Sequence, residues 1–365
     1  CPRQIHLTGT NVLYRIRIKY SVKSSLTLLR RFKLSESNHN HFYIRDFIKH
    51  RNLDGLSDKS LKTLADSKAE STIDSYESDW NDFCDWCHYH KQSAFPASAE
   101  TVVNYINDLA DYAKASTIRR RVSAISENYN AAGPDYKNPC REWIVKEALV
   151  GLSRKKGIAQ KGKTPIYWED MEKMVESMDL KNLTEVRDKA ILLMGFMGAF
   201  RRSELVGLDV EDLSFFPQGM IVSIRQSKTD QMGQGQQLGI PYLEDKHMCA
   251  VLAVKEWISK AGLSTGPLFR RILKSGVPAT NRLSDKTVNL IVKKYARRIG
   301  LREDLYGAHS LRHGFATYAA LHGVEERIIM KQTRHRSVEM VRHYINEANL
   351  FINNPISMIF NKKAR

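Results

Sequence analysis

Residues 309–344 read HSLRHGFATYAALHGVEERIIMKQTRHRSVEMVRHY and predict three consecutive short helices around which the rest of the chain is organised. His309 and Arg312 stand three positions apart, so their side chains share one face of the first helix. Gly323 is expected to end that helix, because glycine is favoured just past a helix C-terminus. A second helical run follows over 324–332, and a third helix is expected to begin near Ser337.

Four polar side chains of this stretch can together bind and attack a phosphodiester: His309, Arg312, His335 and Tyr344. Arginine offers a forked, permanently charged set of donors to the non-bridging oxygens, whose charge grows in the transition state. Histidine can donate a hydrogen bond or move a proton near neutral pH. Tyrosine can attack phosphorus and form a covalent phospho-enzyme, provided that cations assist a phenol whose free pKa is ~10.

The order His-x-x-Arg, then His, then Tyr resembles the C-terminal signature of the tyrosine recombinases, the family of the phage integrases and their relatives. Upstream, GAFRRSELVGLDVEDL at 198–213 resembles the family's first-arginine motif, Arg-x-x-Glu-Leu, which aligns Arg201 and Glu204. The family's hairpin lysine matches Lys228, which lies in a Ser-Lys-Thr stretch between two strand-like runs. The resemblance spans roughly residues 65 to 350.

The chain departs from the family pattern immediately before the second histidine. The family usually has Leu-Gly there, and this chain has Thr333-Arg334. We expect the added Arg334 to face solvent or to contact the DNA backbone. We expect Glu204 to have a structural role, either holding the next helix or pairing with a basic neighbour.

The resemblance implies a site-specific DNA recombinase or integrase that cleaves and rejoins strands through a 3′-phosphotyrosine link. The catalytic set then falls on Arg201, Lys228, His309, Arg312, His335 and Tyr344. In that mechanism the tyrosine attacks the scissile phosphate, the two arginines hold its non-bridging oxygens, and the lysine protonates the departing 5′-oxygen. The second histidine hydrogen-bonds the phosphate, and the first orients the tyrosine or accepts its proton. No ATP, metal or cofactor is implied.

The same resemblance implies a mainly α fold with a small β-sheet, of the α+β class. A helical core-binding domain would precede a mixed α/β catalytic domain. The expected partners are double-stranded DNA, further copies of the chain in a homotetramer on two DNA sites, and accessory DNA-bending proteins.

Composition agrees with a polyanionic partner, because 57 Lys+Arg against 40 Asp+Glu give a formal net charge of +17. A generically basic protein, such as a ribosome-associated factor, would share that charge. No run of about 18 apolar residues is present, so we expect no membrane span. The polar, basic N-terminus lacks a signal-peptide pattern, and 5 Cys at irregular spacing indicate a reducing compartment. We therefore expect an intracellular protein of the cytoplasm, nucleoid or nucleus.

Shifts in composition divide the chain into segments. Residues 1–61 form a basic extension, either a disordered tail or an extra DNA-binding module. Helical patterning covers 62–152, a basic linker broken by glycine covers 153–165, and the catalytic domain covers 166–349. Residues 350–365 form a short apolar tail that would dock into a neighbouring subunit or pack on its own domain.

The helical segment predicts four helices. Ile73, Tyr76, Trp80, Phe83 and Cys87 recur at three- and four-residue intervals and predict the core stripe of the first. The others are expected over about 99–112, from about 116 onward, and over about 139–152.

Basic residues on the third helix and in the linker are candidates for contacts to DNA phosphates without base reading. These are Lys114, Arg119, Arg120, Arg121, Arg154, Lys155, Lys156, Lys161 and Lys163. An ordinary solvated helix surface explains the helical group equally well.

Cys84-Asp-Trp-Cys87-His88 matches a haem-attachment pattern and contains potential zinc ligands. We reject both interpretations, since haem attachment needs export and a zinc site would need a second ligand pair. An apolar helix face explains Cys87 without any metal.

In the catalytic segment, an apolar helix over 190–200 ends at Arg201, and further helices are expected over 247–262 and 284–299. Residues 220–225 predict a strand, and 237–243 predict its return strand.

Two other functions remain open at this point. A type IB topoisomerase-like enzyme would use the same chemistry and religate the same strand. A non-catalytic DNA-binding protein could also use this fold, although intact residues at the catalytic positions argue against it.

Overall fold

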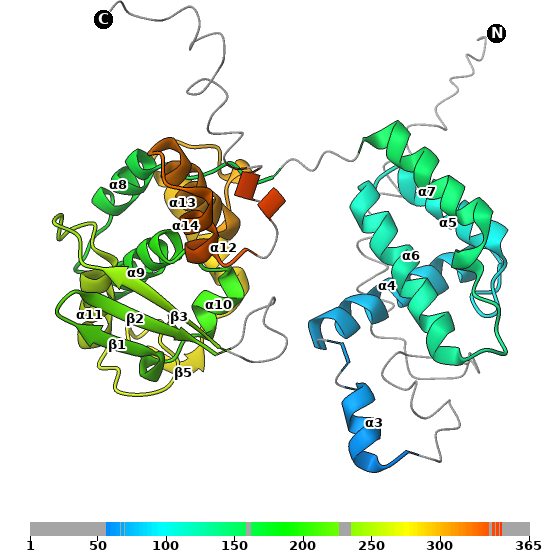
Figure 1. Cartoon of the computed structure of the whole chain (residues 1–365), viewed down its shortest axis with the longest axis horizontal. Coiled ribbons are helices and arrows are strands. Elements are labelled where there is room, and N and C mark those ends of the chain that lie inside the picture. Colours follow the sequence, from blue (N-terminus) through cyan, green and yellow to red (C-terminus); the bar gives the residue numbers. More distant parts are fainter. Residues whose placement is uncertain are drawn as a thin grey trace, which may run out of the picture. The chain divides into compact units, whose positions relative to one another are not determined.

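The computed structural model describes residues 56–65, 67–68, 70–157, 162–225 and 235–335, together with 338, 339, 341, 342 and 344. The chain divides into two compact units, Cys1–Gln160 and Lys161–Arg365 (Figure 1). Both are mainly helical, and the second adds small antiparallel sheets, which confirms the predicted α+β fold class. The predictions for residues 1–55, Lys161, Lys228, the helix start at Ser337 and the tail after residue 349 fall outside the described residues.

In its described part, the N-terminal unit is built from helices. They are α3 (Asp58–Ala65), α4 (Glu70–Tyr89), α5 (Ala99–Ala110), α6 (Ala115–Ala132), the 3₁₀ helix η2 (Pro139–Arg141) and α7 (Trp143–Lys156). The first three predicted helices correspond to α4, α5 and α6. The fourth begins later than predicted, because Asn138 Oδ1 accepts the Cys140 N–H at 3.0 Å and caps η2, and α7 starts only at Trp143.

The core of this unit gathers aromatic side chains from three helices. Trp80, Phe83 and Cys87 of α4 are each at most 1% exposed, which confirms most of the predicted stripe. The Phe83 ring lies 5.0 Å from that of Tyr105 on α5, and the Trp80 ring lies 6.4 Å from Tyr129 on α6. Each buried aromatic side chain contributes about 2–3 kcal/mol, so this cluster is sufficient to hold α4, α5 and α6 together.

Helix α7 runs past its predicted end at residue 152 to Lys156. Arg154, Lys155 and Lys156 therefore belong to its last turn, and their prediction as linker residues is wrong. Cations are favourable there because the last carbonyls of a helix carry partial negative charge. Gly157, at φ 71°, ends the helix.

The second unit combines helices with two small sheets. Its elements are α8 (Trp168–Glu176), α9 (Leu183–Met197), α10 (Arg202–Gly207), η3 (Val210–Asp212), β1 (Leu213–Phe216), β2 (Gly219–Ile224), β3 (Gln236–Pro241), α11 (Ala250–Lys260), β4 (Arg270–Ile272), β5 (Pro278–Arg282), α12 (Asp285–Arg298), η4 (Glu303–Leu305), α13 (Ala308–Leu321) and α14 (Glu326–Thr333). Helix α9 is buried along most of its length and packs against α11 and α13. It forms the central support of the unit.

The larger sheet has β2 between β1 and β3, both antiparallel to it. The predicted strand and return strand are β2 and β3, and Val222 pairs with both Leu213 and Leu238. The sequence did not predict β1, because it has four residues and exposes all of them except Leu213. The unit packs its apolar core on the side of the sheet that carries Val222, which is fully buried.

Helix α13 lies close against the start of the unit. A Cβ at Gly314 would meet the carbonyl oxygen of Ile166 at 2.0 Å, so glycine is needed for this approach. The Ile166 N–H donates to the Ser310 carbonyl at 3.1 Å, and His313 Nδ1 donates to the Lys163 carbonyl at 2.9 Å. These contacts fix the helix that carries His309 and Arg312.

In the ranges described here, we find no helix with the length and apolar character needed to cross a membrane.

Candidate active site

The second unit brings together side chains that lie far apart in the sequence. His309 and Arg312 come from α13, His335 follows α14, and Tyr344 lies further along the chain. The Tyr344 hydroxyl is 3.2 Å from His309 Nε2, and Arg312 Nε donates to His335 Nε2 at 3.4 Å. The His335 and Tyr344 rings are 5.8 Å apart. The phenol and both imidazoles therefore surround one buried guanidinium.

Arg201 reaches this group from the turn after α9. It is the N-cap of α10, where its backbone N–H donates to Glu204 Oε2 at 3.0 Å and its Nη1 donates to Glu204 Oε1 at 2.5 Å. The Glu204 side chain is only 1% exposed. The structural role predicted for Glu204 is thus confirmed, since it both caps the helix and holds Arg201.

Arg312 is a nearly inaccessible cation. It is 1% exposed, and its Nη1 donates to the Ala199 carbonyl at 2.6 Å. Within the described residues, Arg312 Nη2 is buried and has no hydrogen-bond partner. Burial, together with the charges of Arg201 and Arg334, lowers the pKa of Arg312 to about 9. An anion placed beside Nη2 would relieve both its missing hydrogen bond and the repulsion among these cations.

Arg334 is buried, so the prediction that it faces solvent or contacts DNA is wrong. Its side chain is 5% exposed and donates to the carbonyls of Gly198, Ala199 and Gln332 at 2.8–3.1 Å. It also meets Glu204 Oε2 at 3.0 Å. Its backbone is left-handed at φ 56°, the conformation that glycine usually supplies.

The network around His335 selects one tautomer. The Thr333 hydroxyl donates to the Ile329 carbonyl at 2.7 Å, so its oxygen accepts a hydrogen bond from His335 Nδ1–H at 2.8 Å. His335 Nε2 is then free of hydrogen and accepts from Arg312. Burial and the nearby Arg312 lower the pKa of His335 to about 3, so the ring is neutral at pH 7.

His309 is also neutral at pH 7, because partial burial and then Arg312 lower its pKa. The His309 side chain is exposed to solvent. A neutral His309 can accept a proton from the Tyr344 hydroxyl beside it.

Tyr344 is 3% exposed and packs with Ala316, Ile329 and Val341. The His313 ring lies 4.5 Å from the Tyr344 ring. His313 was not among the predicted site residues, although it follows Arg312 directly. The ring contact with Tyr344 depends on tertiary packing.

The predicted DNA-binding residues of the N-terminal unit divide into two groups. Arg121 is an ion-pair residue, because its Nη1 contacts Asp82 and also donates to Tyr105 Oη at 3.0 Å. Arg120 Nη1 pairs with Asp79, whose side chain is 5% exposed, at 2.5 Å. The ion pair with Asp82 accounts for the position of the Arg121 side chain without a phosphate contact. The Arg120 guanidinium is likewise paired, with Asp79.

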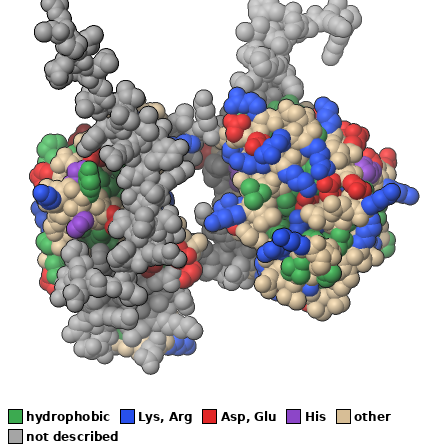
Figure 2. Space-filling model, turned by 180° about the vertical axis from the view of Figure 1, so that it is seen from behind, with side chains coloured by type: hydrophobic (Ala, Val, Ile, Leu, Met, Phe, Trp, Pro, Cys, Tyr) green, Lys and Arg blue, Asp and Glu red, His purple; other side chains and the backbone are tan. Residues whose placement is uncertain are grey.

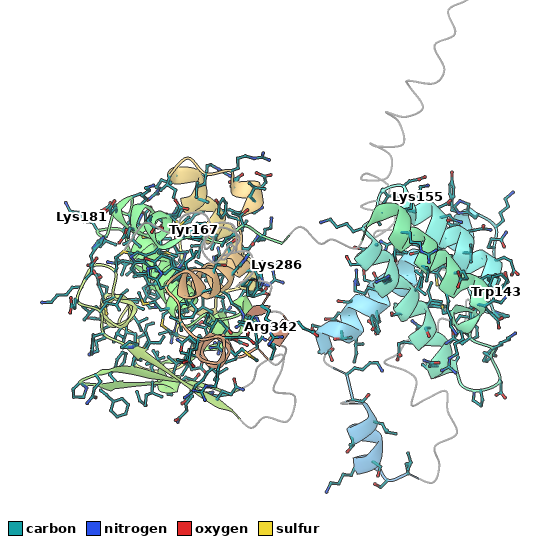
Figure 3. All side chains as sticks on the ribbon, turned by 45° about the horizontal axis from the view of Figure 1, so that its top comes forward. Trp143, Lys155, Tyr167, Lys181, Lys286 and Arg342 are labelled. Atoms are coloured by element: carbon teal, nitrogen blue, oxygen red, sulfur yellow. The ribbon has the colours of Figure 1, made fainter. Side chains whose placement is uncertain are left out.

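The second group lies where α6 begins and α7 ends. Arg119 Nη2 donates to Ser153 Oγ at 2.5 Å, and Lys156 Nζ donates to the Ala113 carbonyl at 2.8 Å, so the two helix ends are adjacent. Lys114, Arg154 and Lys155 are exposed in the same region. Figure 3 labels Lys155 near the end of α7, opposite Trp143 at its start. We call Lys114, Arg119, Arg154, Lys155 and Lys156 the α6–α7 basic patch.

Lys163 belongs to the second unit, where its Nζ donates to the Asp304 carbonyl at 2.5 Å. On the face of that unit visible in Figure 2, Lys and Arg side chains are spread among acidic ones rather than gathered in one place.

The cysteine motif lies in the N-terminal core. Cys87 is 1% exposed and packs among apolar side chains, as predicted from the helix pattern. In the part of the chain that the structure describes, no group of three or more His, Cys, Asp or Glu side chains is arranged to hold a metal ion.

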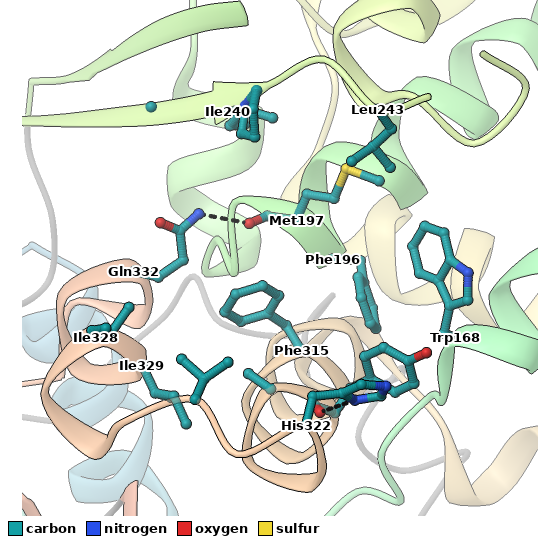
Figure 4. A pocket seen from close by; sticks show the side chains of 15 residues that line it. Trp168, Phe196, Met197, Ile240, Leu243, Phe315, His322, Ile328, Ile329 and Gln332 are labelled. Carbon is teal, nitrogen blue, oxygen red and sulfur yellow. Dashed lines mark hydrogen bonds between the residues drawn. The ribbon is translucent and has the colours of Figure 1, made fainter. Parts of the chain in front are cut away.

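An apolar pocket of about 490 Å³ lies beside the site, between α9, β3, α13 and α14. Its lining includes Trp168, Phe196, Ile240, Phe315 and Ile328 (Figure 4). Ile328 is 51% exposed, so the pocket opens to solvent.

Two family profiles match this chain. The profile of the phage integrase family matches residues 166–350, and that of the phage integrase N-terminal SAM-like domain matches residues 61–132. The chain therefore belongs to the phage integrase family of tyrosine recombinases, a family of site-specific recombinases.

One curated relative and two solved structures illustrate the similarity in sequence and in fold. The chain is 48% identical over 312 residues to an integrase/recombinase xerD homolog of Selenomonas ruminantium, an alignment that covers 85% of this chain and 92% of the relative. The structure superposes on a XerH recombinase bound to palindromic difH DNA after cleavage, with a TM-score of 0.62, 16% identity and 94% of each chain covered. It is also similar to a lambda integrase tetramer bound to a Holliday junction, with a TM-score of 0.51, 15% identity and coverage of 95% of this chain and 90% of that one.

Proposed function

We propose that the chain cleaves and rejoins DNA through a covalent 3′-phosphotyrosine link formed by Tyr344. The observation that carries this proposal is the Tyr344 hydroxyl, 3.2 Å from a neutral His309 and next to the buried Arg312. Nucleophile and base are within hydrogen-bond reach, and a guanidinium stands beside them. The attack forms a bond from the phenolic oxygen to phosphorus and breaks the bond to the 5′-oxygen.

The remaining side chains would stabilise charge and transfer protons. Arg201 and Arg312 would hold the non-bridging oxygens, where preorganised donors act most strongly in a water-poor site. His335 would hydrogen-bond the phosphate through Nε2 after a change of tautomer, because Nε2 carries no hydrogen while it accepts from Arg312. Lys228, which lies outside the described residues, would protonate the 5′-oxygen. His309 would take the proton of Tyr344. Strand exchange would need no ATP, because the tyrosyl link keeps the phosphodiester energy, and the guanidinium groups would do the electrostatic work without a metal.

DNA affinity would come in part from the N-terminal unit. The α6–α7 basic patch is exposed at adjoining helix ends, which suits contacts to successive phosphates. The ion pair with Asp82 argues against this role for Arg121. The XerH and lambda integrase neighbours are DNA complexes, which supports double-stranded DNA as the partner of this chain.

The working assembly would be a homotetramer on two DNA sites. The lambda integrase neighbour is a tetramer, which supports this assembly here. Residues 350–360, LFINNPISMIF, carry enough apolar side chains for the tail of one copy to fill the apolar pocket of a second copy. Removing residues 350–365 should then abolish tetramers on paired sites in gel filtration while single-site binding remains. Unchanged tetramers would refute tail exchange.

A covalent-trapping assay tests the proposed function directly. The substrate would be a nicked duplex with the attachment sequence mapped in the DNA that flanks the gene, so that cleavage releases a short strand and cannot reverse. We expect a protein–DNA adduct that survives denaturing electrophoresis and is absent with Tyr344→Phe, although Tyr344→Phe binds the duplex normally. An adduct that persists in Tyr344→Phe, or no adduct with the wild type, would overturn the proposal. Relaxation of supercoiled plasmids without this sequence would indicate the topoisomerase-like alternative.

A further inference from the structure

Arg334, which departs from the family pattern, contacts the residues that hold the other two arginines of the candidate site. We propose that Arg334 is a positioning residue, because its guanidinium holds Arg201 through Glu204 and holds Arg312 through the carbonyl of Ala199. This inference rests on the proposed function, in which the two other arginines bind the scissile phosphate.

The first support is the C-terminal end of α9. Its last carbonyls have no partner within the helix and carry partial negative charge. Arg334 Nη1 donates to the Gly198 carbonyl at 2.9 Å, and Gln332 Nε2 donates to the Met197 carbonyl at 2.8 Å, the bond drawn in Figure 4. Two side chains from the end of α14 thus cap α9, and the segment that continues to His335 is held against the turn that carries Arg201.

The Ala199 carbonyl links Arg334 to Arg312. It accepts from Arg312 Nη1 at 2.6 Å and from Arg334 Nη2 at 3.1 Å. Ala199 has φ 43°, a left-handed conformation that a residue with a Cβ rarely adopts. Two guanidinium groups on one carbonyl hold this turn in its uncommon conformation. The direction of that carbonyl sets where Arg312 Nη2 points.

Glu204 links Arg334 to Arg201. Its Oε2 accepts from Arg334 Nη2 and from the Arg201 N–H, both at 3.0 Å, while Oε1 accepts from Arg201 Nη1. Without Arg334 the carboxylate would be free to turn further toward Arg201. Arg201 would then be neutralised more completely by Glu204 and less available to a phosphate.

The side chain and the backbone of residue 334 can be separated by substitution. Glycine adopts the left-handed backbone at φ 56° more readily than arginine, so Arg334→Gly keeps the turn while it removes the whole side chain with its guanidinium. Arg334→Lys keeps a charge, but an ammonium on a flexible stem cannot reproduce the planar fork that spans three carbonyls and a carboxylate. Arg327→Ala is a matched control on α14, because that arginine is 90% exposed.

The test measures single-turnover cleavage of the nicked duplex at saturating protein, well below the melting temperature of each variant. We expect Arg334→Gly and Arg334→Lys to slow cleavage about 100-fold, the size of effect that a misplacement near 1 Å produces. DNA affinity should stay within about two-fold, because the α6–α7 basic patch is untouched. Arg327→Ala should cleave at the wild-type rate.

A second substrate separates positioning from a general loss of structure. In a duplex with a methylphosphonate at the scissile position, the negative charge that Arg201 and Arg312 bind is absent. The defect of Arg334→Gly should then shrink to less than about 10-fold. Equal defects on both substrates, or a wild-type rate for Arg334→Gly on the phosphate, would overturn the inference. If the wild type itself gave no adduct, the proposed function would have failed instead.

Discussion

Two arginine clusters, one in each unit, are neutralised in different ways. In the N-terminal unit, Arg120 and Arg121 meet Asp79 and Asp82, so each cation has its own carboxylate. In the described residues of the second unit, the guanidinium groups of Arg201 and Arg334 share Glu204, and the buried Arg312 bonds to a carbonyl and a histidine.

We infer from this difference that the first cluster stabilises the fold, whereas the second is positioned to bind an anionic ligand. A matched pair is satisfied without a partner molecule and stabilises the helices that it joins. The cluster around Glu204 keeps surplus positive charge in a region where desolvation is costly, and burial and mutual repulsion lower the pKa values of Arg312 and Arg334. A phosphate would supply the missing negative charge. We therefore expect substitutions in the two units to affect different measurements.

The largest effect is expected at Arg201. Arg201→Ala should slow covalent cleavage about 10²–10³-fold, because one preorganised donor to the developing charge is lost. DNA affinity in a gel-shift assay should change little. The control is Arg202→Ala, since the adjacent side chain is 52% exposed and pairs with Asp285. Comparable losses in the two variants would show that the wrong arginine has been assigned.

The next effect concerns Glu204 and stability. Glu204→Gln leaves the buried Arg334 and the partly buried Arg201 without their carboxylate and should lower the free energy of unfolding at pH 7 by about 3 kcal/mol. Although burial favours its neutral form, Arg334 and Arg201 lower the pKa of Glu204 overall. Its contribution is therefore complete above the unfolded pKa of about 4.3 and disappears as pH falls through the folded value. Urea unfolding of the wild type and Glu204→Gln at several pH values measures this contribution to the free energy of unfolding.

The matched control is Glu325→Gln, a change at a carboxylate that is 70% exposed. It should alter the free energy of unfolding by less than about 0.5 kcal/mol. A similarly small effect for Glu204→Gln would contradict the shared-carboxylate account.

A smaller effect should appear in the pH dependence of stability. The folded pKa of His335 is about 3, below its unfolded value, so the unfolded chain takes up a proton first as pH falls below about 6.5. With allowance for solvent at this half-buried ring, the wild type should lose about 1–2 kcal/mol of stability between pH 7 and pH 5 from this residue. His335→Asn should remove that part of the slope, whereas the exposed His322→Asn should not. Parallel slopes for the wild type and His335→Asn would rule out the buried neutral ring.

The smallest effect is expected in the α6–α7 basic patch. Lys155→Ala should weaken DNA binding modestly and reduce the slope of log affinity against log salt by about 1, as the loss of one phosphate contact does. Arg121→Ala should leave the salt slope unchanged and lower the melting temperature of the N-terminal unit, since it breaks the contact with Asp82. A reduced salt slope in Arg121→Ala with an unchanged slope in Lys155→Ala would contradict the assignment of Arg121 to an ion pair and of Lys155 to a phosphate contact.

Much of the fold followed from local patterns. The spacing of Trp80, Phe83 and Cys87 predicted the buried face of α4, and apolar alternation predicted β2 and β3. Short elements were missed, because β1, β4 and β5 have three to five residues and few buried side chains. The end of α7 was placed too early, since a basic stretch was interpreted as a linker although cations are favourable in a last helical turn.

The chemistry of the site was likewise visible in the sequence, whereas its supports were not. Residue types and spacing singled out His309, Arg312 and Tyr344 for one task, because phosphate chemistry needs a cation, a base and a nucleophile. The resemblance to the family added Arg201. The burial of Arg334 could not be predicted from the sequence, because a charged residue next to a motif is ordinarily exposed to solvent. No local pattern indicates that the C-terminal end of α9 lies against this side chain.

By itself, then, the sequence determined the residue types available for the proposed chemistry and the positions of most of the helices, since both depend on residue type and short-range spacing. Only the tertiary structure decided which cations are matched by carboxylates and which remain in surplus. That outcome depends on contacts between positions more than a hundred residues apart, such as Arg334 with Glu204 and Arg312 with Ala199. Such contacts form when buried helices pack against each other. Burial then raises the free-energy cost of every charge or hydrogen-bond donor that lacks a partner, and such groups favour the binding of a ligand that can supply one.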